Sequence, residues 1–178
     1  MLDKKIILEA EKNVRRYLED GKLKRVETIN YNIINTYKKN YLESLKVAED
    51  TLKNNTSPLW VIVCSYYSMF YSTNAVLYKL GYKTGMEIVH KVTFDSLIVF
   101  VRNKLSKELI DYFKEAKEHA LELAEFKSNE LIESFSSELD KRGRYQYDMS
   151  EEIKRARAET SLKRAKEFVF EMEKLLAD

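Results

Sequence analysis

The stretch PLWVIVCSYYSMFYSTNAVLYKLG, residues 58–81, decides the fold of this chain. It is apolar nearly all the way round a helix and carries a single charged residue, Lys79. This pattern predicts a central helix that is packed on several sides. Ser57 suits its N-cap, Pro58 its first turn and Gly81 its end. Five serine, threonine and asparagine residues within the stretch argue against a membrane span.

Helical patterns also surround this central stretch. Apolar residues recurring at three- and four-residue steps predict a buried face on the segment before it and on the last helix. The residues of the first face are Tyr31, Ile34, Tyr41, Leu45, Ala48 and Leu52, and those of the second are Ala158, Leu162, Ala165, Val169, Met172 and Leu176. The further helices expected are 3–19, 30–54, 92–105, 107–140 with an irregularity at 127–129, and 149–176.

The connecting segments carry turn signals. Gly21 is positioned to end the first helix and to begin a connector, GKLKR. The segment KTGMEIVHK, residues 83–91, is expected to be a short turn in which Thr84 and Glu87 form a capping box before the next helix.

Composition agrees with a helical bundle. The 178 residues fit one domain, 1–178, and they include only four glycines and one proline. We therefore predict an all-α, up-and-down bundle of four to five long helices.

The single cysteine, Cys64, excludes an internal disulfide and a multi-cysteine zinc site. The single cysteine also makes a reducing cytoplasm the expected location. The N-terminus mixes both signs of charge without the apolar core of a signal peptide, and no membrane association is expected.

Charge is distributed unevenly, although the net charge is only +2. Residues 105–140 hold ten acids and four lysines, whereas residues 141–166 hold nine Lys or Arg and four acids. The basic block has two interpretations. It is a solvated face paired with the acidic helix, or it is a patch that binds phosphate groups.

Several stretches, in order along the chain, resemble the HEPN domain family, small helical proteins of prokaryotes often encoded beside a minimal nucleotidyltransferase. In SYYSMFYSTNAVLYKLG, residues 65–81, we find the family's Tyr-Tyr pair, its small and aromatic residues, and its Ala-containing run ending in Gly. His90 and Lys91 match the start of its next helix, although a valine replaces the usual serine. RGRYQYD, residues 142–148, and KRAKEFVFEMEKLL, residues 163–176, resemble its late Arg-x-x-x-Asp-Tyr turn and its final helix.

The resemblance implies a HEPN-like bundle that forms a homodimer, with a site at the loop before the last helix. Ribonucleases of the family carry an Arg followed four to six residues later by His, because cleavage needs a proton carrier and a fixed cation. Here Tyr147 follows Arg142 after four residues, and neither histidine has an arginine at that spacing. A tyrosine with its ordinary pKa of about 10 transfers protons poorly at neutral pH. Arg142 and Tyr147 are therefore catalytic candidates through the resemblance alone.

The segment KRGRYQYD, residues 141–148, is interpreted first as a turn, with Gly143 easing the backbone and Asp148 capping the last helix. It is interpreted second as a variant of the family site that still holds phosphate. The candidate residues for binding RNA or a nucleotide are Arg142, Arg144, Tyr147, Lys154, Arg155 and His90. A buried tyrosine of the central helix could find a partner in Arg142 or Asp148.

The two histidines differ in the roles expected for them. His90, at the head of a helix, is either a structural histidine hydrogen-bonded near the central helix or a residue that assists anion binding. His119 is expected to be exposed. The histidines and acids lack the spacing of metal ligands, and no glycine-rich phosphate loop is present, so no metal or cofactor is expected.

Three functions remain open from the sequence. The first is a HEPN partner that binds RNA or a nucleotide and works with a minimal nucleotidyltransferase in a toxin–antitoxin-like or defence module. The second is an active, metal-independent ribonuclease toxin. The third is a non-enzymatic, dimeric helical adaptor without a role in nucleic-acid binding.

Overall fold

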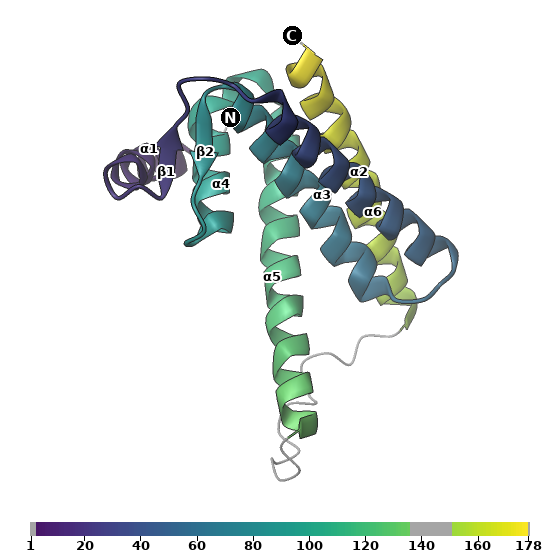
Figure 1. The fold of residues 1–178 in the computed structure, drawn as a ribbon. Coiled ribbons are helices and arrows are strands. Elements are labelled where there is room, and N and C mark those ends of the chain that lie inside the picture. The colour runs from purple at the N-terminus through teal and green to yellow at the C-terminus, as the bar shows by residue number, and fades with distance from the viewer. Residues whose placement is uncertain (1–2, 136–150, 178) are drawn as a thin grey trace.

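The computed structural model describes residues 3–135 and 151–177, with side chains described over 3–123 and 154–177. These residues form six α-helices, a 3₁₀ turn and two short strands. Figure 1 labels the α-helices and the strands. Their bounds are α1 Lys4–Glu19, β1 Leu23–Arg25, α2 Tyr31–Lys53, α3 Pro58–Lys79, β2 Tyr82–Thr84, α4 Val89–Phe100, η1 Arg102–Lys104, α5 Lys107–Phe135 and α6 Glu151–Ala177. The predicted all-α bundle is confirmed, and α2, α3, α5 and α6 are its long helices.

Helix α3 lies at the centre of the bundle, as predicted. It packs against α2, α4, α5, α6 and β2. The side chain of Ser57 accepts a hydrogen bond from the backbone N–H of Trp60 and caps the helix, with Pro58 in its first turn. Tyr66 and Met69 are fully buried, and most other residues of α3 are buried as well. The apolar pattern of residues 58–81 therefore reflects contact with neighbours on several sides.

Helices α2 and α6 lie beside α3 (Figure 1). The predicted buried face of α2 is confirmed at Tyr41 and Ala48, which are both inaccessible to solvent. It is wrong at Tyr31, which is 72% exposed. Tyr31 is the first residue of α2 and lies at the rim of an open groove bordered by the last turn of α6. Periodicity cannot detect this, because it does not reveal where the neighbouring helix ends.

The predicted connectors contain a two-stranded sheet instead of simple turns. Strands β1 and β2 pair antiparallel, with Leu23 opposite Thr84 and Arg25 opposite Tyr82. Gly21 and Gly81 precede the strands with φ angles of 71° and 87°, which glycine adopts without steric cost. Each strand is three residues long, which is too short to give an alternating sequence pattern.

The polar residues of α3 join neighbouring elements. The Asn74 side chain donates to the hydroxyl of Thr93 in α4 and accepts from the hydroxyl of Thr84 in β2. At the end of α3, the ammonium group of Lys79 donates to the backbone carbonyl of Leu176, 2.9 Å away. A cation at that position compensates carbonyls that the last turn of α6 leaves unpaired.

Two predicted helix boundaries differ from the structure. Helix α4 begins at Val89 and is followed by the 3₁₀ turn η1, so the expected helix 92–105 is wrong at both ends. Helix α5 is continuous through residues 127–129, where an irregularity was expected. In Figure 1, α5 runs past the ends of the helices around it.

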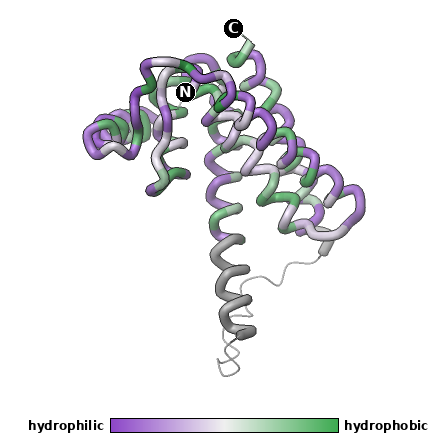
Figure 2. The backbone as a smooth tube through the Cα atoms, viewed as in Figure 1, coloured by the Kyte–Doolittle hydropathy of each residue, from purple (hydrophilic) through white to green (hydrophobic). Residues whose placement is uncertain are grey.

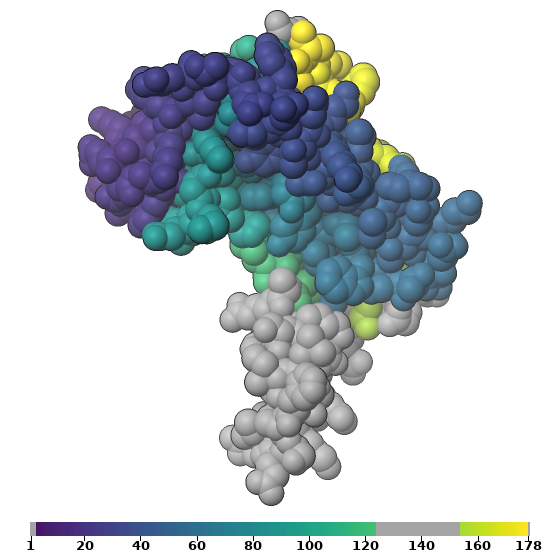
Figure 3. All heavy atoms as spheres, in the orientation of Figure 1, coloured from purple at the N-terminus to yellow at the C-terminus, as the bar shows by residue number. Residues whose placement is uncertain are grey.

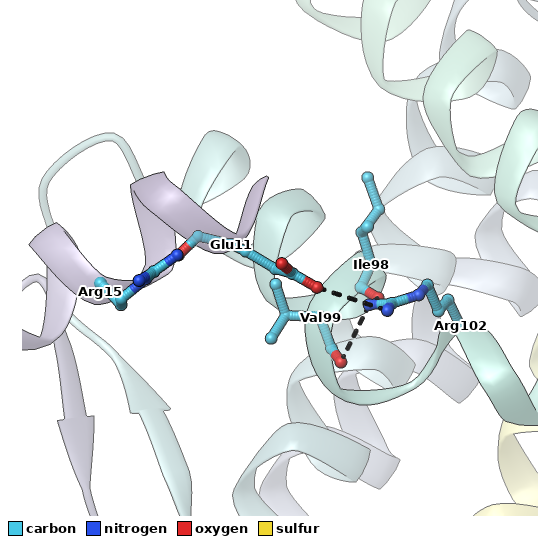
Figure 4. A network of polar contacts seen from close by, with 5 residues as sticks. All are labelled: Glu11, Arg15, Ile98, Val99 and Arg102. Carbon is cyan, nitrogen blue, oxygen red and sulfur yellow. Dashed lines mark hydrogen bonds and ion pairs between the residues drawn. The ribbon is translucent and has the colours of Figure 1, made fainter. Parts of the chain in front are cut away.

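The α1 helix lies to one side of α2, α3 and α6, together with the two strands and α4 (Figure 1). Arg102 of η1, just after α4, adds a polar contact to α1. Its guanidinium donates to the carbonyl of Ile98 in α4 at 2.9 Å and to Glu11 of α1 at 3.4 Å (Figure 4). The same guanidinium reaches the carbonyl of Val99 at 3.4 Å. One side chain therefore both compensates the C-terminal end of α4 and connects it to α1.

Figure 2 shows hydrophilic and hydrophobic residues mixed along the outer helices, as expected for helices with one buried face. In the space-filling view of Figure 3, α1, α2 and the start of α3 form most of the visible face, and α6 appears only at its edge. None of the helices in the described residues is long and apolar enough to cross a lipid bilayer.

Candidate functional site

The candidate site residues from the sequence fall into two groups. Arg142, Arg144 and Tyr147 lie outside the described residues, as does the segment KRGRYQYD that contains them. His90, Lys154 and Arg155 lie within them. The described candidate regions are therefore the surroundings of His90 and the first half of α6.

His90 is part of a cluster of aromatic rings between α4 and α3. Its Nδ1 lies 2.8 Å from the hydroxyl of Tyr66. The imidazole centroid lies 4.8 Å from the ring centroid of Phe70 and 5.9 Å from that of Tyr67. The structural histidine bonded near the central helix is thereby confirmed. Arg142 and Asp148, the partners suggested for a buried tyrosine of the central helix, lie outside the described residues, and the described partner of Tyr66 is His90.

The surroundings of His90 favour its neutral form. Burial lowers the pKa of His90, and the positive charge of Lys117 lowers it further. Burial also raises the pKa of Tyr66, so its phenol keeps its proton. A neutral imidazole has one nitrogen that accepts and one that carries hydrogen. When Tyr66 donates to Nδ1, the N–H of His90 is at Nε2, and the ring brings no positive charge to a phosphate.

The start of α4 lacks the predicted capping box. Thr84 belongs to β2 and donates its hydroxyl hydrogen to Asn74, while Glu87 is an exposed partner of Lys22 at 3.6 Å. The N-cap residue is Ile88, which has a φ of 41° and makes no side-chain capping bond. A branched side chain rarely adopts this left-handed conformation. The turn before His90 is consequently strained in a way that its sequence did not reveal.

A second polar cluster lies between α1 and α4, and the sequence analysis missed it. The carboxylate of Asp95 accepts hydrogen bonds from the Tyr17 hydroxyl at 2.9 Å and from the Asn13 amide at 3.1 Å. Asp95 is only 7% exposed, and burial raises its pKa. The available signal was one acid in the otherwise apolar run TFDSLIVFV. A buried acid at such a position needs partners, which α1 supplies.

Beside this cluster, a pocket opens between α1, α4 and α5. It has a volume of about 260 Å³ and is lined by residues that include Asp95, Lys91 and Lys117. The Lys117 ammonium group lies 4.5 Å from the centroid of the Phe94 ring. Burial lowers the pKa of Lys117, and Lys114 and Lys91 act in the same direction. The pocket thus combines a buried carboxylate with two lysines.

The basic residues of α6 are partly engaged in ion pairs. Arg155 contacts Glu159 at 3.1 Å and the side chain of Asn55 at 2.8 Å. Arg164 pairs with Glu115 of α5 at 2.6 Å, and Lys166 pairs with Glu49 of α2 at 2.7 Å. Lys154 is half-buried. Pairing with the acidic helix is therefore observed for Arg164, while other basic residues pair elsewhere.

Two other cations of α6 have different surroundings. Arg157 and Lys163 are exposed and form no ion pair or hydrogen bond with any residue that the structure describes. They lie on the half of α6 nearest the basic segment 141–148. An exposed cation without a neighbouring carboxylate remains available for a phosphate group.

Other expectations concern the second histidine and metal ligands. His119 is exposed, as predicted. Over the part of the chain that is described, no three His, Cys, Asp or Glu side chains group closely enough to hold a metal ion.

The chain matches no family model, no curated protein and no solved structure. The candidate sites are consequently defined by this chain's own residues, namely the exposed cations of α6, the His90 cluster and the pocket beside Asp95.

Proposed function

We propose that this protein is a HEPN-like helical protein that binds RNA or a nucleotide and works with a minimal nucleotidyltransferase in a toxin–antitoxin-like or defence module. The observation that carries the proposal is that two exposed cations of α6, Arg157 and Lys163, form no ion pair with any described residue. They continue the basic run that begins at residue 141. The motifs at residues 65–81, 90–91 and 142–148 support the same proposal by their resemblance to the family.

The physical basis of binding is the release of counterions from phosphates. Each contact between a cation and a phosphate makes the affinity fall more steeply as salt concentration rises. Arg155 contributes less to this effect than Arg157, because Glu159 already offsets part of its charge. Arg142 and Arg144 continue the proposed basic surface in the sequence before α6.

The proposed role is binding, with the standard ribonuclease reaction disfavoured. Tyr147 stands where the family's nucleases carry histidine, and a tyrosine of ordinary pKa is a poor proton carrier at neutral pH. His90, the histidine of the aromatic cluster, bonds Tyr66 and has a lowered pKa. Neither residue supplies the pairing of histidine with arginine that the reaction requires.

The salt dependence of RNA binding tests the proposal. We expect the double variant Arg157→Ala, Lys163→Ala to bind a short single-stranded RNA more weakly, with a salt slope reduced by about one unit per lost contact. The matched control is Lys24→Ala, Lys83→Ala, which removes two exposed lysines from β1 and β2. Fluorescence anisotropy at several salt concentrations measures both quantities. Equal effects of the two double variants, or no RNA binding at all, would favour the dimeric adaptor.

A histidine substitution tests the second candidate, a ribonuclease. Tyr147→His restores the family's spacing of histidine after Arg142. RNA cleavage near neutral pH by this variant would locate a ribonuclease site of the family's Arg…His type in the segment 142–147. Cleavage by the unaltered protein that is lost in Arg142→Ala would instead establish an active ribonuclease. The proposed partner requires that a neighbouring gene encode a minimal nucleotidyltransferase. We expect co-expression of that gene with this protein to give a complex that survives size-exclusion chromatography, and a neighbouring gene of another kind would contradict the proposed partner.

A further inference from the structure

We propose that the pocket between α1, α4 and α5 binds a small zwitterion of the α-amino acid type, a site separate from the proposed RNA surface. The pocket measures about 260 Å³ and is bounded by Glu9 of α1, by Lys91, Phe94 and Asp95 of α4, and by Lys117 and Leu121 of α5. Helix α1 therefore meets α4 and α5, which lie far from it in the sequence, and each of the three helices contributes at least one charged group.

The carboxylate of Asp95 is prepared to accept a further hydrogen bond. Tyr17 and Asn13 both donate to its Oδ2 atom. Its Oδ1 atom accepts no hydrogen bond from the residues that the structure describes, although Asp95 lines the pocket. The two donors fix the orientation of the carboxylate before any ligand arrives. A ligand ammonium group can therefore approach Oδ1 with little reorganisation of the protein.

Lys117 provides the opposite charge on the facing helix. Its ammonium group lies 4.5 Å from the centroid of the Phe94 ring, and no acid among the described residues forms an ion pair with it. Burial lowers the pKa of Lys117, which indicates that water solvates this ammonium group incompletely. An anionic ligand group would restore part of the lost solvation. Lys91 adds a second, exposed cation to the same wall.

The balance of charges selects the ligand class. Two carboxylates, Glu9 and Asp95, and two ammonium groups, Lys91 and Lys117, line the pocket, so its formal charge is zero. A phosphate would be repelled by the negative charges of both carboxylates, and a simple amine would be repelled by the positive charges of both lysines. A molecule with an ammonium and a carboxylate group satisfies both sets at once. Leu121, which is 39% exposed, offers an apolar contact for its side chain.

The size of the pocket limits the ligand to a small molecule. Its volume of about 260 Å³ lies below the range usual for drug-sized ligands, about 300–1,000 Å³. An α-amino acid with a short apolar side chain has the required size. Because the pocket joins α1 to α4 and α5, a ligand there would also hold α1 against the bundle and raise the melting temperature.

Calorimetric titration and thermal melting with matched probes test the proposal. We expect L-leucine or another of the apolar L-amino acids to bind and to raise the melting temperature. For L-leucine the matched probes are 3-methylbutylamine, which lacks the carboxylate, and 4-methylpentanoate, which lacks the ammonium group. Neither should bind. Inorganic phosphate and adenosine monophosphate serve as anionic probes. Binding of either anion in place of the amino acids would overturn the proposal, and so would no binding by any amino acid.

Substitutions place the binding in this pocket. Lys117→Gln and Asp95→Asn should each weaken amino-acid binding by about tenfold or more, because each removes one charged partner. Glu9→Gln and Lys91→Gln, at exposed positions, keep the test valid if the buried variants fail to fold. The control is Lys12→Gln, an exposed lysine of α1 that does not line the pocket. Amino-acid binding that survives the four pocket substitutions would overturn the proposal.

Discussion

His90 is the residue whose surroundings are most clearly set by tertiary contacts. The rings of Tyr66, Tyr67 and Phe70 in α3 surround its imidazole, and Lys117 of α5 contributes positive charge. These neighbours exclude water on one side and oppose protonation on the other. The sequence left His90 as either a structural histidine or an anion-binding residue, and these surroundings favour a neutral imidazole that is hydrogen-bonded to Tyr66.

The lowered pKa of His90 predicts a specific dependence of stability on pH. In the unfolded chain His90 takes up a proton near its ordinary pKa of 6.5, whereas burial and Lys117 lower this pKa in the folded protein. The unfolded state therefore binds more protons just below pH 6.5, and stability falls as pH decreases through that window. We expect this fall to be smaller in His90→Gln. Urea denaturation between pH 7 and pH 5 measures it, and identical pH profiles for both proteins would contradict the assignment.

The hydroxyl of Tyr66 predicts a stability cost that a matched tyrosine does not share. Tyr66→Phe removes the hydrogen bond to Nδ1 of His90 and should lower the free energy of unfolding by about 1 kcal/mol. Tyr71→Phe makes the same change on the same helix, where the ring is half-buried and no described hydrogen bond involves its hydroxyl. Thermal or urea melts compare the two. An equal cost for both variants would argue against a stabilising role of the Tyr66–His90 contact.

At the scale of elements, polar side chains add to the apolar packing that holds α1 against α4 and the turn after it. Asp95 accepts hydrogen bonds from Tyr17 and Asn13 of α1. Arg102 donates a hydrogen bond to Glu11 of α1 (Figure 4). Both contacts come from α4 and the turn after it. The end of α4 and the position of α1 are therefore coupled through the same short stretch of chain.

Arg102→Ala should loosen α1 and the last turn of α4 together. It removes the donor to the carbonyls of Ile98 and Val99 and the partner of Glu11, at a cost of about 1–2 kcal/mol. Hydrogen exchange should become faster in both segments. Arg15→Ala is the control, because exposed Arg15 bonds only the Glu11 backbone carbonyl within its own helix. Faster exchange in α1 alone would show that Arg102 does not compensate the end of α4.

On the scale of the whole molecule, charge separates along the chain and is only partly neutralised by contacts. Arg164 and Lys166 of α6 reach acids of α5 and α2, whereas Arg157 and Lys163 reach none among the described residues. Large apolar side chains also remain on the surface, including Phe170 at 57% exposure and Trp60 at 54%. Both features leave surface available for other molecules.

We expect a homodimer in solution. The long apolar faces of the helices and the exposed aromatic residues favour association, and the family resemblance implies the same state. Sedimentation equilibrium at micromolar concentration should give a mass about twice 21.1 kDa. A mass of one chain over the whole concentration range would contradict the expectation and weaken the resemblance.

The sequence by itself determined the helical class and the central place of α3. Residues 58–81 are apolar on nearly every side, and a helix with this pattern is stable in water only when other elements cover it. The capping of α3 by Ser57 and the buried seam of α6 are also local or periodic features. Such features depend on spacing along the chain, which the sequence contains directly.

Only the tertiary structure decided which distant side chains meet. The pairing of β1 with β2, the contact of Tyr66 with His90 and the buried carboxylate of Asp95 join residues 24 to 82 positions apart. Tyr31 belongs to a predicted buried face but lies exposed at the end of the bundle. Hydrogen bonds and ion pairs depend on distance in space, and helical periodicity states only which face of each element turns inward. The polar sites of this protein were therefore set by how its helices pack.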